Sequence, residues 1–433
     1  MIQRSILEWQ SIGYGADNNT IPDLHAARLA AVARGSTFSG RGGEGVLEHR
    51  RNDLRARGVV GVIAARDCQL EILPKIEAMG EQDLPNPGIL RQRLVHMLAV
   101  THNLRIDTGP TARLGWQRDT LLEILIRIFC SKLIDVVRQG MPRRYIDHDE
   151  DLPALRGRLD VTRQFSVLAA QPQKLACRFD ELSPDIALNQ VMKATVTKLS
   201  KLSRSVDNQR HLRELGFVYA DIKNVPPTVL RWDRIVLDRT NERWRELLSL
   251  ARLLLGERYQ QTSAGASDGH ALLFEMNVLF EKYVAQLLKR ALADTPFSVT
   301  TQGGHRDCLF DDTQGRFRTL PDIIIRRGNE IVLVIDTKWK RIAARIDDPK
   351  RGVKQSDIYQ LMAYSQLYDC RRVMLLYPHH HGLSNEPIQQ AYSVAVPAGQ
   401  NELHISTIDV SAARSEVLVS LKTIVRDCLG VSS

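Results

Sequence analysis

The sequence has few features of a secreted or disulfide-stabilised protein. Its six cysteines are scattered and none forms a C-x-x-C pair, which argues against a structural zinc site. A disulfide framework is not expected in a chain of 433 residues. The first ten residues carry Arg4 and Glu8 and have no apolar core of a signal peptide. We therefore expect a cytoplasmic protein.

Two further absences exclude other classes of protein. The most apolar predicted helix, near residues 121–137, contains four charged side chains, which rules out a simple membrane span. The glycine-rich stretch 35–45 lacks the Lys-Ser/Thr ending of a phosphate-binding loop, and no helix pattern follows it. We interpret this stretch as a flexible loop or hairpin tip, so the chain carries no motif of a nucleotide-hydrolysing motor.

What the sequence does have is a basic charge balance on an ordinary globular composition. Hydrophobic residues make up 43% and charged residues 25%, and the formal net charge is +9. A basic balance favours a polyanionic partner, of which nucleic acid is the first candidate. A basic protein without such a partner remains an equal alternative on charge alone.

The pattern of predicted elements indicates a multidomain α+β protein of three regions. Residues 1–85 form a β-rich N-terminal domain, with strands at 58–64 and 69–76 around a polar turn. Residues 86–262 form a mainly helical middle region. Residues 263–433 have the order of an α/β domain. The predicted helices of the middle region cover residues 90–104, 120–137, 185–202 and 241–255. The predicted elements of the third region are a helix at 271–291, strands at 297–302, 319–326 and 331–337, a helix at 356–367 and a strand at 373–377.

Two adjacent strands of the third region carry the residues that point to chemistry. Asp322 stands at the start of the first apolar run, and Asp336 stands at the end of the second. A Gly-Asn pair at 328–329 predicts a turn that joins them as an antiparallel hairpin. Both aspartates then lie side by side at one edge of the sheet. Lys338, two residues after Asp336, points to the same face.

Two carboxylates and a lysine at one sheet edge suit the hydrolysis of a phosphodiester. Asp322 and Asp336 would hold a hard divalent cation, Mg²⁺, with the backbone carbonyl of Thr337 as a further ligand. Lys338 would position the attacking water or neutralise charge on phosphate oxygens. Between residues 326 and 354, nine Lys or Arg against four Asp or Glu predict a rim that contacts phosphates. The alternative for the site is a strand-end aspartate paired with a lysine.

Flanking helices offer further candidates. Gln360 and Tyr364 stand at i and i+4 on one predicted helix, so that both can contact the lysine or a DNA phosphate. The helix before the strands adds a third carboxylate, either Glu275 or Glu281, because both lie at borders of its apolar stripe. We name Glu275 as a candidate catalytic residue and leave the choice open. The triplet at 379–381 is interpreted as a loop, because three adjacent histidines do not converge easily on one ion.

The PD-(x13)-DTK hairpin followed by QLMAY resembles the PD-(D/E)xK nuclease superfamily, in its branch with a Q-x-x-x-Y helix. The whole chain is more closely similar to McrC, the nuclease subunit of McrBC-type modification-dependent restriction systems. Four stretches outside the hairpin carry that likeness, at residues 70–76, 156–160, 179–189 and 274–283. The resemblance spans most of residues 1–380.

The resemblance implies a PD-(D/E)xK endonuclease domain at residues 263–433, with Asp322, Asp336 and Lys338 matching the nuclease motif. It also implies a partner, a McrB-like AAA+ hexamer that binds GTP and whose GTP hydrolysis this subunit stimulates. The N-terminal domain would contact that motor, and double-stranded methylated DNA would be cut with Mg²⁺. Two alternatives stay open: a stand-alone DNA-repair nuclease, and a non-catalytic activator of a AAA+ ring.

Overall fold

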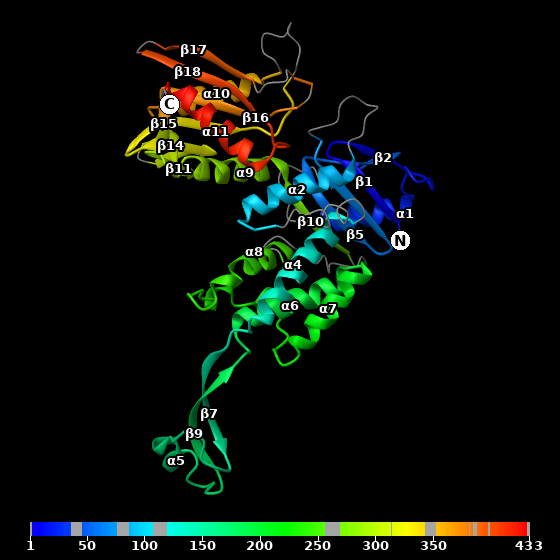
Figure 1. Cartoon of the computed structure of the whole chain (residues 1–433), viewed down its shortest axis with the longest axis vertical. Coiled ribbons are helices and arrows are strands. Elements are labelled where there is room, and N and C mark those ends of the chain that lie inside the picture. Colours follow the sequence, from blue (N-terminus) through cyan, green and yellow to red (C-terminus); the bar gives the residue numbers. More distant parts are fainter. Residues whose placement is uncertain are drawn as a thin grey trace. The chain divides into compact units, whose positions relative to one another are not determined.

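The chain divides into two compact units, shown in the computed structural model of Figure 1. One unit joins Met1–Leu121 with Arg258–Ser433, and the other is Leu122–Glu257. The fold is mixed α+β, as the sequence predicts, while the division into three regions stays a prediction. Within the part of the chain that the structure describes, none of the helices has the length and apolar character needed to cross a bilayer. The described residues are 2–35, 46–75, 86–106, 119–255, 269–312, 314–342, 352–380, 382–383, 388–396 and 399–430.

A four-stranded sheet forms the centre of the N-terminal part of the first unit. Its order is β1 (Ile2–Leu7), β6 (Cys68–Leu73), β5 (Val59–Ala65) and β10 (Gly269–Glu275). β5 and β6 are the predicted hairpin, confirmed with Asp67 at its turn in a left-handed conformation of φ 61°. The predicted glycine-rich loop lies almost entirely outside the described residues.

The strand β10 corrects the sequence analysis. Residues 271–275 were predicted to open a helix, but they pair antiparallel with β5 from Gly269 opposite Ala65 to Glu275 opposite Val59. The helix begins only at Met276. Pairing with a strand some two hundred residues earlier therefore overrides the local helical pattern.

A second small sheet and two helices complete this part. The sheet has the order β2 (Ser11–Gly13), β4 (Asp53–Ala56) and β3 (Leu47–His49). Helix α1 (Asp23–Arg34) packs three buried alanines, Leu29 and Val32 on the strands, and the sequence analysis did not predict it. Helix α2 (Pro87–Thr101) is held by a buried ion pair, in which Arg91 Nη2 lies 2.7 Å from Glu71 Oε2 of β6.

The C-terminal part of the same unit is a six-stranded mixed sheet. Its order is β11 (Phe297–Thr301), β14 (Ile323–Arg327), β15 (Glu330–Thr337), β16 (Arg372–Pro378), β18 (Gly399–Ile408) and β17 (Gln389–Val396). β14 and β15 are antiparallel, whereas β15, β16 and β18 run parallel. A separate hairpin of β12 (Arg306–Asp311) and β13 (Gln314–Thr319) precedes β14. The strands predicted at 297–302, 331–337 and 373–377 are thereby confirmed within two residues.

Three helices pack on this sheet. Helix α10 (Gln355–Leu367) joins β15 to β16 and buries Leu361 and Tyr364 in one cluster with Ile324 and Val334 of the hairpin. Helices α9 (Met276–Ala291) and α11 (Arg414–Leu429) pack against each other and against the sheet (Figure 1). The crossover through α10 places that helix beside the end of β15, where the candidate site lies.

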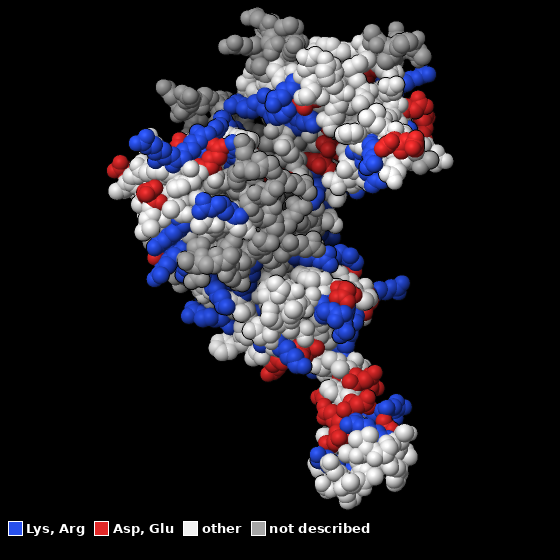
Figure 2. All heavy atoms as spheres, turned by 180° about the vertical axis from the view of Figure 1, so that it is seen from behind, with Lys and Arg blue, Asp and Glu red and all other residues white. Residues whose placement is uncertain are grey.

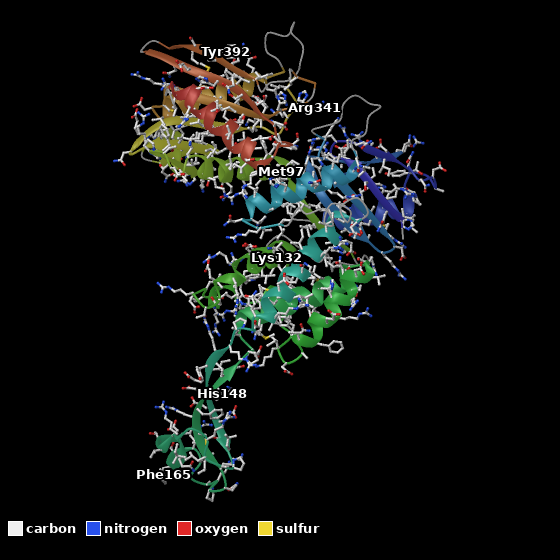
Figure 3. All side chains as sticks on the ribbon, viewed as in Figure 1. Met97, Lys132, His148, Phe165, Arg341 and Tyr392 are labelled. Atoms are coloured by element: carbon white, nitrogen blue, oxygen red, sulfur yellow. The ribbon has the colours of Figure 1, made fainter. Side chains whose placement is uncertain are left out.

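The second unit is a group of helices with one long ribbon. Its helices are α4 (Leu121–Arg138), α6 (Ala187–Leu202), α7 (Val206–Val218) and α8 (Arg245–Leu255), with 3₁₀ turns at Pro227–Val229, Trp232–Arg234 and Glu242–Trp244. The helices predicted at 120–137, 185–202 and 241–255 are confirmed, apart from the 3₁₀ start of the last. Glu123 of α4 is buried and accepts hydrogen bonds from Ser203 Oγ and Asn208 Nδ2, both at 2.7 Å. Lys132, labelled in Figure 3, pairs with Glu246 at 2.8 Å and ties α4 to α8.

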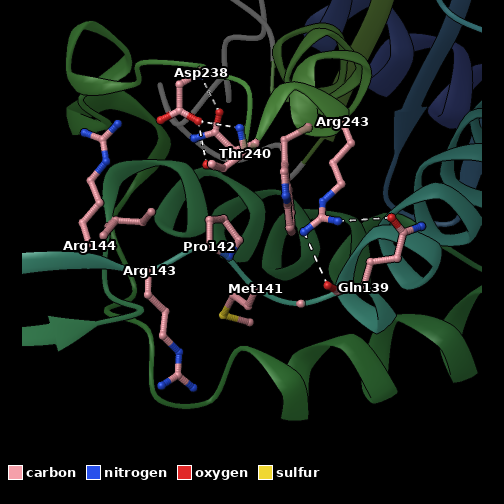
Figure 4. A pocket seen from close by; sticks show the side chains of 12 residues that line it. Gln139, Met141, Pro142, Arg143, Arg144, Asp238, Thr240 and Arg243 are labelled. Carbon is pink, nitrogen blue, oxygen red and sulfur yellow. Dashed lines mark hydrogen bonds between the residues drawn. The ribbon is translucent and has the colours of Figure 1, made fainter.

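The ribbon extends from these helices as β7 (Arg144–Leu152) and β9 (Leu175–Ser183), with β8 (Arg158–Leu159) and α5 (Val161–Ser166) near its tip. Acidic side chains gather along it (Figure 2). Two stretches that carry the family likeness meet here: Arg156 lies over the Phe179 ring at 4.1 Å, and Asp160 pairs with Arg178 at 2.6 Å. At the base of the ribbon, a cavity of about 370 Å³ is lined by Arg143, Arg144 and Arg243 among others (Figure 4).

Candidate active site

The site lies at the open end of the β14–β15 hairpin. Ile323 faces Ile335 across the two strands, so Asp322 and Asp336 stand next to each other at the same edge, as predicted. Gly328 forms the turn with φ 60°, a conformation that glycine adopts without strain. Asp336 is buried and Asp322 is partly buried.

Asp322 is oriented by the strand that carries the second aspartate. Its Oδ2 accepts two hydrogen bonds from Thr337, one from the backbone N–H at 2.7 Å and one from the hydroxyl at 2.8 Å. One carboxylate oxygen is thereby fixed against the protein. The side chain has few remaining rotamers, so the other oxygen has a defined direction.

Lys338 joins the two carboxylates to helix α10. Its Nζ lies 2.7 Å from Asp336 Oδ2 and donates a hydrogen bond to Gln360 Oε1 at 3.2 Å. The amide of Gln360 in turn donates to Tyr364 Oη at 2.7 Å. Of the predicted i, i+4 pair, Gln360 contacts the lysine directly and Tyr364 contacts Gln360. The hydroxyl of Tyr364 also donates to the backbone carbonyl of Leu320 at 3.4 Å, two residues before Asp322.

The structure separates the two glutamates that the sequence leaves open. Glu275 is exposed at the end of β10, opposite Val59 of the N-terminal sheet. Glu281 lies further along α9, where its Oε1 accepts a hydrogen bond from Gln302 Nε2 at 3.1 Å. The charge of Glu281 raises the pKa of Asp322, and the charge of Asp336 in turn raises the pKa of Glu281. Glu281, not the named candidate Glu275, is thus the carboxylate that the fold brings toward the site.

The site concentrates negative charge where water is partly excluded. Burial and the neighbouring Asp322 raise the pKa of Asp336 to about 6. The pKa of Asp322 is raised by burial and by Glu281, and that of Glu281 is raised by burial. Burial acts to lower the pKa of Lys338, but the carboxylates around it, Asp336 first, raise it overall and keep the ammonium charged.

The comparisons with known proteins all point to one family. The family described as "McrBC 5-methylcytosine restriction system component" matches residues 54–378, well over half of the chain. This chain belongs to the McrBC family. A curated relative, the "Type IV methyl-directed restriction enzyme EcoKMcrBC" of Escherichia coli K12, is 20% identical over 257 residues, which cover 57% of this chain and 72% of the relative.

Solved McrBC structures share the fold. A chain in the Thermococcus gammatolerans tetradecameric assembly of McrB AAA+ hexamers with bound McrC matches with a TM-score of 0.69 at 19% identity, over 98% of this chain and 99% of that one. A second match, in the cryo-EM structure of the McrBC complex from the same organism, has a TM-score of 0.52 at 22% identity. It covers 70% of this chain and 89% of that one. The likeness covers both units of this McrBC-family chain.

The donor set fits a divalent cation that keeps much of its water. Among the described residues, no three His, Cys, Asp or Glu side chains form a complete cage for a metal. Asp322 and Asp336 nevertheless present hard oxygen ligands whose mutual repulsion a cation would relieve. Mg²⁺ is usually bound through one or two carboxylates and retains several waters. The carbonyl of Thr337 remains a predicted third ligand.

Some residues around the site escaped the sequence analysis. Asp357 in the first turn of α10 is buried and pairs with Lys340 Nζ at 2.7 Å. Asp357 stands three residues before Gln360 and therefore on the same helical face, a spacing from which its place near the site could have been predicted. The indole N–H of Trp339 donates to Glu8 Oε1 at 2.7 Å. The two residues are 331 positions apart, so no local sequence pattern predicts this contact.

The histidine triplet is structural where it can be described. His379 Nδ1 lies 3.1 Å from the hydroxyl of Thr407, and the buried His380 Nε2 lies 3.0 Å from the carbonyl of Ile342. These contacts agree with the predicted loop. His381 and residues 343–351 of the predicted basic rim lie outside the described residues.

Proposed function

We propose that this chain is the endonuclease subunit of a McrBC-type restriction system, and that its C-terminal part is a PD-(D/E)xK nuclease domain. The observation that carries the proposal is the convergence of Asp322, Asp336 and Lys338 at one end of a buried hairpin. The family match supports a place in a restriction system, since it is named for 5-methylcytosine restriction. The reaction would be hydrolysis of a DNA phosphodiester.

Each residue has a defined task in this reaction. Asp322 and Asp336 would hold Mg²⁺, with Thr337 orienting Asp322 through its two hydrogen bonds. Bound Mg²⁺ supplies Lewis acidity toward the scissile phosphate. Lys338, held charged by the carboxylates, would place its ammonium against the negative charge that develops on the phosphate oxygens. Gln360 and Tyr364 would keep the lysine in that position.

The partner is inferred from the solved relatives. The Thermococcus assembly contains McrB AAA+ hexamers with bound McrC, and we propose that this chain likewise binds a McrB-like AAA+ hexamer and stimulates its GTP hydrolysis in the cytoplasm. The sequence carries no Lys-Ser/Thr ending of a phosphate-binding loop after its glycine-rich stretch, and we therefore propose that another subunit supplies the motor. We propose that the β-rich N-terminal part contacts the motor.

A reconstituted cleavage assay tests this function. Methylated and unmethylated plasmid would be incubated with Mg²⁺ and GTP, together with this chain alone, its McrB-like partner alone, or both. We expect cleavage of methylated plasmid only when both proteins and Mg²⁺ are present. Cleavage by this chain alone would instead identify a stand-alone nuclease, and no cleavage under any condition would leave it an activator of the ring.

A further inference from the structure

A cavity opens beside the active site, at the junction of the N-terminal sheet and helix α9. Its volume is about 510 Å³, and it is lined from three directions. Glu8, Trp9 and Lys75 come from the ends of β1 and β6, and Asn277 from the start of α9. Trp339, Lys340 and Arg341 follow β15, and Lys354 precedes α10. Arg341 is labelled in Figure 3. The cavity is linked to the candidate site through Lys340, which pairs with Asp357, a carboxylate whose charge acts on Asp336.

The charge of the cavity is strongly positive. Four of its lining residues are cationic, namely Lys75, Lys340, Arg341 and Lys354, whereas Glu8 is the one acidic residue in the described lining. The Glu8 carboxylate is already engaged: it is buried, and its Oε1 accepts from the backbone N–H of Lys75 at 3.1 Å and from the indole of Trp339 at 2.7 Å. Lys340 is also engaged, since its Nζ lies 2.7 Å from Asp357 Oδ2 of helix α10. The exposed Lys75 and Lys354 are therefore the cations that can face an anion from outside the protein.

Two indole side chains share this wall with the cations. Trp339 is fixed, since Phe280 packs on its ring at 5.3 Å between centroids and Asn277 Oδ1 accepts its backbone N–H at 3.2 Å. Trp9 is 47% exposed, on a turn whose backbone has φ 66°. Gly58 lies close to the ring, and the Arg55 guanidinium lies over it at 6.0 Å. The exposed remainder of the indole offers a flat surface on which a base can stack.

We propose that this cavity binds one nucleotide of a DNA strand, next to the phosphodiester at Asp322, Asp336 and Lys338. Lys75 and Lys354 take the phosphate, and Trp9 stacks on the base. The volume lies within the range of small-ligand sites, large enough for a single nucleotide and too small for a duplex. This inference rests on the proposed nuclease function, because that function places a DNA strand beside the cavity.

Equilibrium binding tests the proposal without requiring cleavage. The anisotropy of a short fluorescein-labelled DNA would be measured with the full chain in EDTA, for wild type, Trp9→Ala, Lys75→Glu and the double variant. Both side chains are exposed, so folding should persist. We expect each single variant to bind about ten-fold more weakly, as loss of one base stack or one phosphate contact predicts. Lys75→Glu should also reduce the slope of log affinity against log salt concentration by about one.

The matched control is Lys289→Glu, a charge reversal on the exposed surface near the other end of α9, about 20 Å along the helix from Asn277. It should leave the affinity unchanged. Equal losses in Lys289→Glu and Lys75→Glu would overturn the proposal, because only net charge would then matter. Unchanged affinity in the Trp9 and Lys75 variants would overturn it as well, even if the wild-type complex cleaves DNA.

Photocrosslinking gives a second test that needs no variant. DNA carrying iododeoxyuridine would be irradiated with the wild-type chain, and the crosslinked peptide identified by mass spectrometry. We expect the crosslink at Trp9, competed by excess unlabelled DNA. Competition by free deoxynucleotide at equal nucleotide concentration would instead identify a mononucleotide site and overturn the DNA assignment. A crosslink at Trp9 without cleavage in any reconstitution would uphold the cavity while contradicting the proposed function.

Discussion

Thr337 donates both of its hydrogen bonds to a single oxygen of Asp322, from the backbone N–H at 2.7 Å and from the hydroxyl at 2.8 Å. The last residue of β15 thus orients the aspartate that opens β14. A side chain that orients a metal ligand typically contributes ten- to a hundred-fold to metal affinity or activity. The backbone bond would survive any substitution other than proline, whereas the hydroxyl bond needs threonine or serine.

We therefore predict that Thr337→Val raises the Mg²⁺ concentration needed for half-maximal DNA cleavage by about ten-fold. Valine keeps the shape and removes the donor. The measurement is a Mg²⁺ titration of plasmid cleavage by the reconstituted complex. Thr337→Ser retains the hydroxyl and should behave like wild type; an equal defect in both variants would mean that the hydroxyl bond is not what orients Asp322.

A second prediction distinguishes the two glutamates of the α9 region. Glu281→Gln should weaken cleavage and raise the Mg²⁺ concentration needed for half-maximal cleavage, because Glu281 interacts electrostatically with Asp322 and Asp336. Glu275→Gln should have no effect on either, since its exposed side chain lies at the end of β10. Both would be measured in the same Mg²⁺ titration. A larger defect in Glu275→Gln than in Glu281→Gln would instead identify Glu275 as the third carboxylate of the site.

A third prediction concerns stability and pH. The pKa of Asp336 is raised from the ordinary 3.8 to about 6, chiefly by burial. Between these values the folded protein binds more protons than the unfolded chain, so stability falls as pH rises. Asp336→Asn carries no charge and should be more stable than wild type at pH 7 without divalent cations, by on the order of 2 kcal/mol.

Urea unfolding in EDTA would measure this difference. At pH 4 the gain should disappear, because wild-type Asp336 is then protonated in the fold. Asp294→Asn, an exposed carboxylate in the same unit, serves as the control and should change little at either pH. A variant that is less stable than wild type at pH 7 would show that the pairing of Asp336 with Lys338 outweighs the cost of burial.

A fourth prediction tests the contact between the N-terminal sheet and the end of the β14–β15 hairpin. Glu8→Ala leaves two part-buried donors without an acceptor, the N–H of Lys75 and the indole N–H of Trp339. It should lower the free energy of unfolding by about 1–3 kcal/mol. Glu8→Gln keeps an acceptor and should lose less. Chemical denaturation measures both, and an equal loss for the two would argue that the hydrogen bonds contribute nothing beyond packing.

The sequence was sufficient for the local part of this site. The β14–β15 hairpin has a glycine turn and uninterrupted apolar runs, so the meeting of Asp322 and Asp336 follows from the chain itself. The pairing of Gln360 with Tyr364 follows from helical spacing in the same way.

Contacts between segments that are distant in the sequence could not be predicted from the sequence. The helical wheel could not choose between Glu275 and Glu281, because the choice depends on where helix α9 begins. That start is set by β10, which continues to Glu275 only because β5 is available to pair with it. The Glu8–Trp339 bond depends on the same long-range packing. Nothing in the local pattern of either segment encodes these pairings.

The central claim is that this chain cuts DNA at Asp322, Asp336 and Lys338. The most direct measurement is cleavage of methylated plasmid by the reconstituted complex carrying Asp336→Ala, with Asp294→Ala as the matched control. Circular dichroism and partner binding would confirm that both variants fold and assemble. The account predicts that Asp336→Ala abolishes cleavage while GTP hydrolysis by the partner continues, and that Asp294→Ala cuts normally. Undiminished cleavage by Asp336→Ala would contradict it.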